Sequence, residues 1–240
     1  MENQTPIKDN KGRIWRTIAA IAVAALFLVI IIASLTSKPS HSDKVWDERT
    51  TIGNLEAKNY YIMYTDLMCP YCDVFSREIL NHWEEFEQYI ADNDILFEIR
   101  LTDYLYEGSN HQASRDSAEA AYCATREDRF WDYYHEALTS LWDDYHSKGI
   151  GSSKTATPIK DMPDDYWLQI GHEIGLGDTF DNCVNNHETV DLIVENTQRA
   201  VPVTEGMPSF KFNRFTTSGF DNNWGWDYVK AYLDAGLGKK

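Results

Sequence analysis

The stretch Tyr61-Ile-Met-Tyr-Thr-Asp-Leu-Met-Cys-Pro-Tyr-Cys-Asp-Val-Phe-Ser-Arg-Glu-Ile-Leu80 decides the fold of this chain. It opens with an apolar run typical of a buried strand and closes with apolar residues at helical spacing. Between the two, Pro70 suits the first turn of a helix, where its missing N–H leaves no bond unmade. The stretch therefore predicts a strand, a turn with two cysteines, and a helix.

The two cysteines at this turn, Cys69 and Cys72, predict dithiol–disulfide exchange. Cys69 is expected at the start of the helix, where free backbone N–H groups stabilise a thiolate. Cys72 lies one turn further in and can resolve a mixed disulfide. The alternatives are a structural disulfide or half of a zinc site. Zinc would need a second close pair of ligands, and no cysteine or histidine elsewhere supplies one, so no metal is predicted.

An uncharged apolar run, Ile18–Leu35, is about long enough to cross most of a bilayer core. Basic residues crowd its N-terminal side, which predicts that this side faces the cytoplasm; they are Lys8, Lys11, Arg13 and Arg16. We expect a cytoplasmic arm over 1–16 and an uncleaved transmembrane signal anchor over 17–37. The alternative is a cleaved signal peptide, but its apolar core is normally shorter. The expected location is the cell membrane, with a single pass and an extracytoplasmic catalytic domain.

Charge and cysteine content limit the function classes. The chain has 240 residues and a net charge of −16, and because residues 1–16 carry +2, the remainder carries −18. Such an acidic ectodomain repels phosphate backbones, so nucleic-acid binding is excluded. All four cysteines follow the anchor, and exported cysteines are usually paired. Four cysteines allow three pairings, among which spacing alone does not choose, although Cys69 and Cys72 are the natural pair.

The rest of the chain indicates an α/β domain interrupted by helices. We expect a linker over 38–56, the first part of the domain over 57–101, a helical insertion over 102–200 and the remainder over 201–240. Expected strands are Ala57–Asp66, Ile95–Leu101 (with Ile95, Phe97, Ile99 and Leu101 alternating against the other three residues) and Ser209–Asn213, followed by a hairpin at Arg214–Gly219. Expected helices are Pro70–Asn93, Ala113–Thr125, Arg126–Lys148, Asp164–Ile174, Thr179–Asn186, Glu188–Arg199 and Trp224–Leu237, with a loop at Gly149–Pro163.

A second motif, Gly206-Met207-Pro208-Ser209-Phe210, precedes the late strand. By itself it reads as a strand start, because a proline there loses no ladder bond. Together with Cys-Pro-Tyr-Cys after a strand and the long helical insertion, it resembles the DsbA family of thioredoxin-fold thiol–disulfide oxidoreductases. The resemblance covers about residues 45–237 and is strongest to membrane-anchored extracytoplasmic members of the BdbD type. It implies a thioredoxin fold with an inserted helical subdomain, in addition to the N-terminal transmembrane helix.

The resemblance also implies roles for individual residues. Cys69 and Cys72 would form the redox-active disulfide, with Pro70 and Tyr71 between them. Pro208 would be cis and pack beside the sulfurs, which leaves the backbone of Met207 to pair with a substrate chain. A structural disulfide between Cys123 and Cys183 would staple two helices of the insertion, with free buried thiols as the alternative. Family-matched scaffold residues are Asp66, Trp131 and His135.

Three positions depart from the family pattern. Tyr71 stands where the best-known oxidant has a histidine that holds the thiolate, so the disulfide is expected to be less oxidising. Met63 stands where many members have a buried acid that relays a proton to the second cysteine. Met207 replaces the usual threonine or valine, which bears on substrate preference.

The leading function is therefore a membrane-anchored oxidoreductase that oxidises thiols of exported proteins. The dithiol itself serves as the cofactor, because no flavin, nicotinamide or metal motif is found. The resemblance implies reoxidation by a membrane quinone reductase of the DsbB or vitamin K epoxide reductase type. No dimerisation domain is evident before the first strand, which favours a monomer. The alternatives are a reductase or isomerase of the same fold and a non-catalytic anchored binding module stapled by disulfides.

Overall fold

A computed structural model of the chain describes residues 47–109, 111–154, 157–201, 205–213, 215–219 and 225–239. The chain divides into two units, Met1–Ser40 and His41–Lys240. The predicted cytoplasmic arm and transmembrane anchor, residues 1–37, lie outside the described residues. Among the helices that are described, none has the length and apolar character needed to cross a bilayer.

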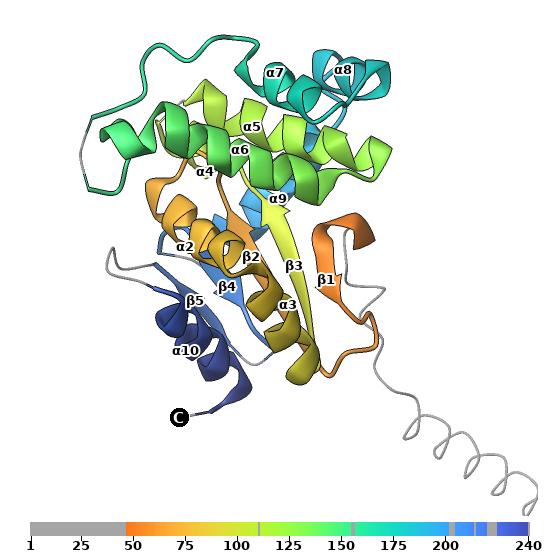
Figure 1. Ribbon diagram of the computed structural model, residues 1–240, viewed down its shortest axis with the longest axis vertical. Helices are drawn as coiled ribbons and strands as arrows, with labels where there is room; N and C mark the ends of the chain where they lie inside the picture. Colours follow the sequence, from red (N-terminus) through yellow and green to blue (C-terminus); the bar gives the residue numbers. More distant parts are fainter. Residues whose placement is uncertain are drawn as a thin grey trace, which may run out of the picture. The chain divides into compact units, whose positions relative to one another are not determined.

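The described part of the second unit is built on a five-stranded mixed sheet in the order β1-β3-β2-β4-β5 (Figure 1). The parallel pair β2 (Asn59–Thr65) and β3 (Ile95–Leu101) lies at its centre. The three-residue strands β1 (Thr51–Gly53) and β4 (Ser209–Lys211) flank this pair and run antiparallel to it. An antiparallel edge strand, β5 (Thr216–Ser218), completes the sheet.

The central strand β3 is buried along its whole length, including its two charged residues. Arg100 Nη2 lies 2.8 Å from Glu98 Oε2 and 3.0 Å from Tyr60 Oη, and the Tyr60 hydroxyl also donates to the Glu98 carboxylate. A buried charge is tolerated when it is paired and hydrogen-bonded. The predicted alternation of residues along β3 therefore separates two buried faces of the strand. One face is apolar, and the other carries the Glu98–Arg100 ion pair.

Three helices cover one face of the sheet (Figure 1): α2 (Pro70–Asn81), α3 (Trp83–Asp92) and α10 (Trp226–Leu237). The predicted continuous helix Pro70–Asn93 is wrong at His82, whose φ of −124° and ψ of 38° are not helical. The His82 ring stacks on the Trp226 ring, with 5.4 Å between the centroids. The backbone carbonyl of His82 accepts the first hydrogen bond of α3, from Phe86 N–H. Tertiary packing against α10 thus interrupts a helix that the apolar spacing alone would continue.

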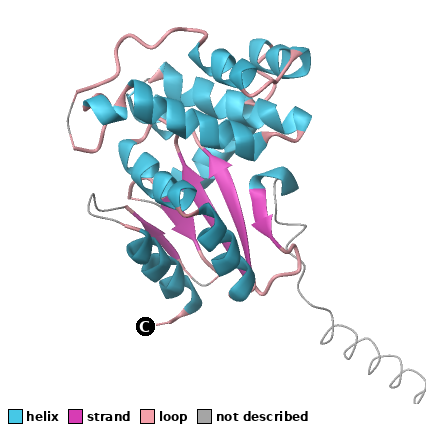
Figure 2. Cartoon of the chain, in the orientation of Figure 1, coloured by secondary structure: helices cyan, strands magenta, loops and turns pink. Residues whose placement is uncertain are grey.

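Most of the helical insertion gathers beyond one end of the sheet, as Figure 2 shows, and its last helix, α9 (Val190–Ala200), packs through Ala200 on the sheet face opposite α2, α3 and α10. Its helices are α4 (Tyr104–Ser109), α5 (Gln112–Cys123), α6 (Phe130–Asp144), α7 (Tyr166–Glu173), α8 (Asp178–Asn185) and α9 (Val190–Ala200), with short 3-10 turns at Ala124–Glu127 and His146–Lys148. Hydrogen bonds tie this group to the end of β3: Asn196 Nδ2 donates to the Leu101 carbonyl and to Tyr122 Oη, and Leu101 N–H donates to Tyr122 Oη. A disulfide between Cys123 and Cys183 joins α5 to α8.

The predicted linker over residues 38–56 needs a correction. A 3-10 turn at Glu48–Thr50 and strand β1 occupy its second half, and β1 pairs with β3 in the register Thr51↔Glu98. Asp47 caps the turn by accepting a hydrogen bond from Arg49 N–H. Three residues are too few for a period-two pattern to emerge, so the neighbour β3 rather than local sequence defines this strand.

Removal of the Cys123–Cys183 disulfide should destabilise the domain markedly. The two cysteines are 60 residues apart in sequence, and closing a loop of that length contributes about 4 kcal/mol in the chain-entropy model. We expect the double variant Cys123→Ala/Cys183→Ala to lose a comparable free energy of unfolding in urea titrations. A variant as stable as the wild-type protein would show that the bond contributes no stability.

Candidate active site

The two motif cysteines lie at the junction of β2 and α2. After β2 ends at Thr65, Cys69 N–H donates to the Asp66 carbonyl at 3.0 Å and so closes a tight turn. Cys69 is the N-cap residue of α2, and Pro70 occupies the first helical position. The backbone N–H of Asp73 donates to the Cys69 carbonyl, which begins the helix. The sequence-predicted placement of Cys69 at a helix N-terminus is therefore the observed one.

The pairing of β2 with β4 brings the second motif to the cysteines. The register Tyr64↔Ser209 is antiparallel, so the residues before Ser209 lie beside the end of β2. The Met207–Pro208 peptide bond is cis. Cys69 Sγ is 3.8 Å from the Met207 carbonyl oxygen, to which it donates a hydrogen bond. Two motifs 138 residues apart thus share one site.

The two sulfurs differ in their surroundings. Cys69 is 6% exposed and Cys72 only 1%, whereas Tyr71 between them is 40% exposed. Burial raises the pKa of the Cys72 thiol well above its usual range, and the neighbouring Cys69 raises it further. The Asp66 backbone and the Thr65 side chain act weakly in the other direction. Cys72 therefore rests as a neutral thiol, and Cys69 is the more exposed of the two cysteines.

A buried carboxylate, Asp66, holds the turn before Cys69. Its oxygens accept hydrogen bonds from Met68 N–H at 2.9 Å, Leu105 N–H at 2.9 Å and Ser114 Oγ at 2.6 Å. Burial raises the pKa of Asp66 to about 6, although each of these hydrogen bonds lowers it. The family-matched acid therefore connects the cysteine turn to the start of the helical insertion.

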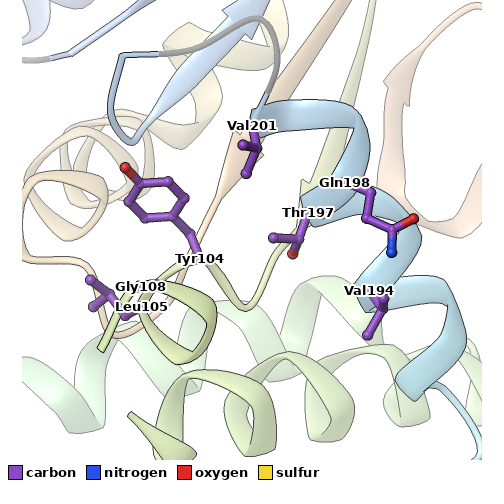
Figure 3. Close-up of a pocket in the computed structure, with 7 residues that line it drawn as sticks. All are labelled: Tyr104, Leu105, Gly108, Val194, Thr197, Gln198 and Val201. Carbon is purple, nitrogen blue, oxygen red and sulfur yellow. The ribbon is translucent and has the colours of Figure 1, made fainter. Parts of the chain in front are cut away.

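Next to the site an apolar cavity of about 680 Å³ opens between α4 and α9 (Figure 3). Its lining carries no charged side chain among the described residues and consists of Tyr104, Leu105, Gly108, Val194, Thr197, Gln198 and Val201. Tyr104 and Leu105 also pack against the apolar cluster that contains Cys69, Cys72 and Met207. The cavity thus borders the packing around the dithiol on the α9 face of the sheet.

The structure places the residues singled out from the sequence in three groups. Cys69, Pro70, Tyr71, Cys72, Met207 and Pro208 come together at the ends of β2 and β4. Cys123 and Cys183 are bonded to each other within the insertion. Trp131 and His135 pack against Trp83 on α3, with ring centroids 5.3 and 4.5 Å away, in a scaffold position.

Several polar side chains near Cys72 were not predicted from the sequence. They are Thr65, Asp73, Ser76, Tyr134 and His146, all of which are buried. They lie at the end of β2, on α2, on α6 and in the 3-10 turn after α6, and they share no sequence pattern, so only their polarity within apolar runs could have pointed to them. Within the described ranges, no three His, Cys, Asp or Glu residues form a group that could hold a metal ion.

A parallel β2–α2–β3 unit, a dithiol at the start of α2 and a cis-proline before an antiparallel strand define a dithiol protein of thioredoxin fold. A family model described as Thioredoxin matches residues 46–235. The chain belongs to this thioredoxin family. Comparison with curated proteins gave no match.

Solved structures of similar fold include thiol–disulfide oxidoreductases. A thioredoxin-like oxidoreductase from Silicibacter pomeroyi DSS-3 is 19% identical with a TM-score of 0.55, over 81% of this chain and 95% of that one. DsbG from Mycobacterium tuberculosis is 19% identical with a TM-score of 0.53, over 78% and 82%. Wolbachia pipientis α-DsbA1 is 18% identical with a TM-score of 0.55, over 79% and 90%. At these identities the likeness concerns the fold, which is that of the DsbA and DsbG proteins.

The raised pKa of Asp66 makes a testable contribution to stability. The pKa of about 6 in the folded protein lies above the ordinary 3.8, so folding favours the protonated carboxyl of Asp66. The stabilisation that this protonated form contributes is complete below pH 4 and is lost as pH rises through 6. The difference corresponds to about 3 kcal/mol. In urea titrations, the free energy of unfolding of wild-type protein minus that of Asp66→Asn should fall by about this amount from pH 4 to 7. A constant or rising difference would contradict the raised pKa.

Proposed function

We propose that this protein is a DsbA-type thiol–disulfide oxidoreductase that oxidises thiols of exported proteins through a Cys69–Cys72 disulfide. The observation that carries the proposal is the position of Cys69 Sγ. It lies at the N-terminus of α2, 3.8 Å from the Met207 carbonyl, with Cys72 one turn inside the helix. This arrangement offers one sulfur for exchange and a backbone segment beside it for a substrate chain.

The reaction begins with the Cys69–Cys72 disulfide. A substrate thiolate attacks Cys69 Sγ, the bond between the two enzyme sulfurs breaks, and the electron pair leaves on Cys72 Sγ. A second substrate thiolate then attacks the substrate sulfur of the mixed disulfide. Cys69 leaves as a thiolate, so the substrate dithiol is oxidised by two electrons to a disulfide and the enzyme disulfide is reduced by two electrons to the dithiol.

Two features support the oxidising direction. The Cys123–Cys183 disulfide is of a kind that persists in oxidising compartments, where new disulfides are formed. The helix N-terminus favours negative charge at Cys69 and thereby favours the reduced form of the enzyme, which makes the disulfide a better oxidant. Tyr71 acts against this direction, because it cannot supply the positive charge of a histidine, and a reductase or isomerase is therefore the second candidate.

The proposal includes a place in the cell. Ile18–Leu35 carries no charge, and the four basic residues before it favour a single-pass anchor at residues 17–37 with a cytoplasmic N-terminus. The dithiol would then face exported proteins with free thiols as a monomeric domain. Reoxidation would come from a membrane quinone reductase of the DsbB or vitamin K epoxide reductase type, which takes up the two electrons.

Replacement of Cys72 by Ser should trap substrates on Cys69, because no resolving thiol is left to release them. We expect Cys72→Ser to yield disulfide-linked adducts in the membrane fraction on non-reducing gels, whereas the matched variant Cys69→Ser yields none. Wild-type protein should also promote disulfide formation in reduced ribonuclease. Absence of both adducts and refolding activity would favour the binding-module alternative, and adducts in the soluble fraction alone would refute the anchor.

The reduction potential of the Cys69–Cys72 pair distinguishes the directions. An oxidase should lie closer to DsbA, at about −120 mV, than to thioredoxin, at about −270 mV. Tyr71→His should raise the reduction potential. Each tenfold change in the equilibrium constant with glutathione corresponds to about 30 mV. Tyr71→Phe serves as the control because it adds no charge. A wild-type value near that of thioredoxin would favour the reductase reading.

A further inference from the structure

A buried carboxylate and a buried histidine face each other one helical turn beyond the dithiol. Asp73 lies on α2, and its backbone N–H donates to the Cys69 carbonyl at 3.0 Å. His146 begins the 3-10 turn that follows α6. Asp73 Oδ2 is 3.1 Å from His146 Nδ1, and the two side chains are 4% and 1% exposed. The first turn of α2 therefore meets the Met207 carbonyl through Cys69 and the helical insertion through Asp73.

Both side chains leave polar atoms unsatisfied. Asp73 Oδ1 and His146 Nε2 are buried and have no hydrogen-bond partner in the part of the chain that the structure describes. His146 Nδ1 is close enough to Asp73 for an ion pair but is not aligned for a hydrogen bond. A buried polar atom without a partner costs stability, above all when its group is charged. A ligand that donates a hydrogen bond to Asp73 Oδ1 removes this cost.

These two residues line a cavity of about 490 Å³, which we call the α2 cavity. It lies between α2 and the segment that follows α6, and small-molecule sites are commonly of this size. Its wall carries two acids, Asp73 and Glu78, and two bases, Arg77 and Lys154. Asp73 is buried, whereas Arg77 is half-buried and Lys154 is exposed. The α2 cavity therefore combines a buried acceptor with cations closer to the solvent.

The two cations of the α2 cavity are available to an anionic group. The Arg77 guanidinium lies 4.1 Å from the centre of the Trp142 ring, and its Nη1 is 3.5 Å from the Leu138 carbonyl. Neither Arg77 nor Lys154 forms an ion pair with an acid among the residues that the structure describes. Since residues 17–240 carry a net charge of −18, acidic partners are abundant in the chain. Two cations without such a partner on one cavity wall favour a ligand with a carboxylate.

The charges of the α2 cavity select an amphoteric ligand. An ammonium group fits Asp73 Oδ1, because a charged donor makes a strong hydrogen bond with a carboxylate. A carboxylate fits Arg77, whose planar guanidinium matches its geometry. A ligand with cationic groups alone would meet Arg77 and Lys154, and a ligand with anionic groups alone would meet Asp73. A short peptide with free end groups satisfies both requirements.

The position of the α2 cavity suits a peptide that also carries a thiol. Cys69 and Asp73 are four residues apart, so they share a helix face and are separated by about 6 Å along the axis. A peptide of two or three residues spans about 7–11 Å when it is extended. Such a peptide can hold its ammonium group at Asp73 while its sulfur reaches Cys69.

We propose that the α2 cavity is a subsite for short peptide thiols with a free ammonium group and a free carboxylate. The ammonium group donates to Asp73 Oδ1, and Arg77 and Lys154 hold the carboxylate. The inference rests on the proposed exchange reaction and names a substrate class for it.

The bound peptide reacts in two steps. Its thiolate attacks Cys69 Sγ, the bond between the enzyme sulfurs breaks, and the electron pair leaves on Cys72 Sγ, which takes up the proton that the peptide thiol released to water. A second peptide thiolate then attacks the peptide sulfur of the mixed disulfide, and Cys69 leaves as a thiolate. Two peptide thiols are oxidised to one peptide disulfide, and the Cys69–Cys72 disulfide is reduced to the dithiol.

Three thiols separate recognition in the α2 cavity from exchange itself. Glutathione carries an ammonium group and carboxylates, its glutaryl analogue lacks only the ammonium group, and mercaptoethanol lacks both. Oxidised protein is mixed with each thiol, and acid quenching with alkylation gives the rate at which the Cys69–Cys72 disulfide opens per thiolate. Since a hydrogen bond to a charged group is worth about tenfold or more, glutathione should react at least tenfold faster than its glutaryl analogue.

Asp73→Asn tests the acceptor, with Glu84→Gln as the matched control. Both variants remove one acidic charge, but Glu84 lies on α3 and does not line the α2 cavity. Asp73→Asn should bring the rates with glutathione and its glutaryl analogue to within about twofold of each other, and Glu84→Gln should keep the wild-type ratio. Each rate is divided by the rate with mercaptoethanol, which removes any change in the reactivity of Cys69 itself.

Lys154→Gln tests the cation and does not depend on the folding of a variant in the buried pair. Because Lys154 is exposed, its replacement leaves the packing of the domain intact. The rate with glutathione should fall severalfold in Lys154→Gln, and the rate with mercaptoethanol should stay at the wild-type value. An unchanged rate with glutathione would contradict the role given to this lysine.

Two negative results have different meanings. If wild-type protein opens at equal rates with glutathione and its glutaryl analogue, or if Asp73→Asn keeps the preference of Glu84→Gln, the subsite is refuted while the reaction with mercaptoethanol shows that exchange stands. If mercaptoethanol does not open the wild-type disulfide and Cys72→Ser traps no partner, the proposed function itself is refuted.

Discussion

The antiparallel pairing of β4 with β2 is the constraint on which the site depends. Cys69 and Pro208 come from opposite ends of the domain sequence, and only the register Tyr64↔Ser209 places them together. This pairing must survive the insertion of the whole helical group between β3 and β4. Asn196 and Thr197 help to secure it, since Asn196 bonds the end of β3 and Thr197 bonds both the backbone and the carboxylate of Asp103.

Two groups of buried polar side chains in the domain are held together by hydrogen bonds. Asp66 accepts three hydrogen bonds at the cysteine turn, and Glu98 and Arg100 pair on the α9 face of the sheet. Since an unpaired buried polar group costs far more than a paired one, each set fixes the local geometry. The Asp66 set holds the turn of Cys69 against the start of α4, and the pair on β3 allows a central strand to carry charge.

The two cysteine pairs show how environment assigns different roles to the same chemistry. Cys123 and Cys183 are buried in α5 and α8, where their bond joins two helices of the insertion. Cys69 and Cys72 lie in the first turn of α2, and Cys69 is beside the Met207 carbonyl. The sulfur that needs reactivity is placed at a helix end, and the sulfur that needs only to leave and return is buried one turn behind it.

Local sequence determined much of this protein by itself. The apolar run before Cys69, the proline after it and the apolar spacing beyond specify β2, the turn and α2, because strand, helix start and helix all depend on residues close in sequence. The resemblance carried by the two motifs led to the thioredoxin fold and to the pairing of Cys123 with Cys183. Tertiary structure alone decided the break at His82, the strand β1, the burial of Glu98 with Arg100 and the hydrogen bond between Ser76 and Tyr134. Each of these depends on a neighbour far away in the chain, and local spacing contains no information about that neighbour.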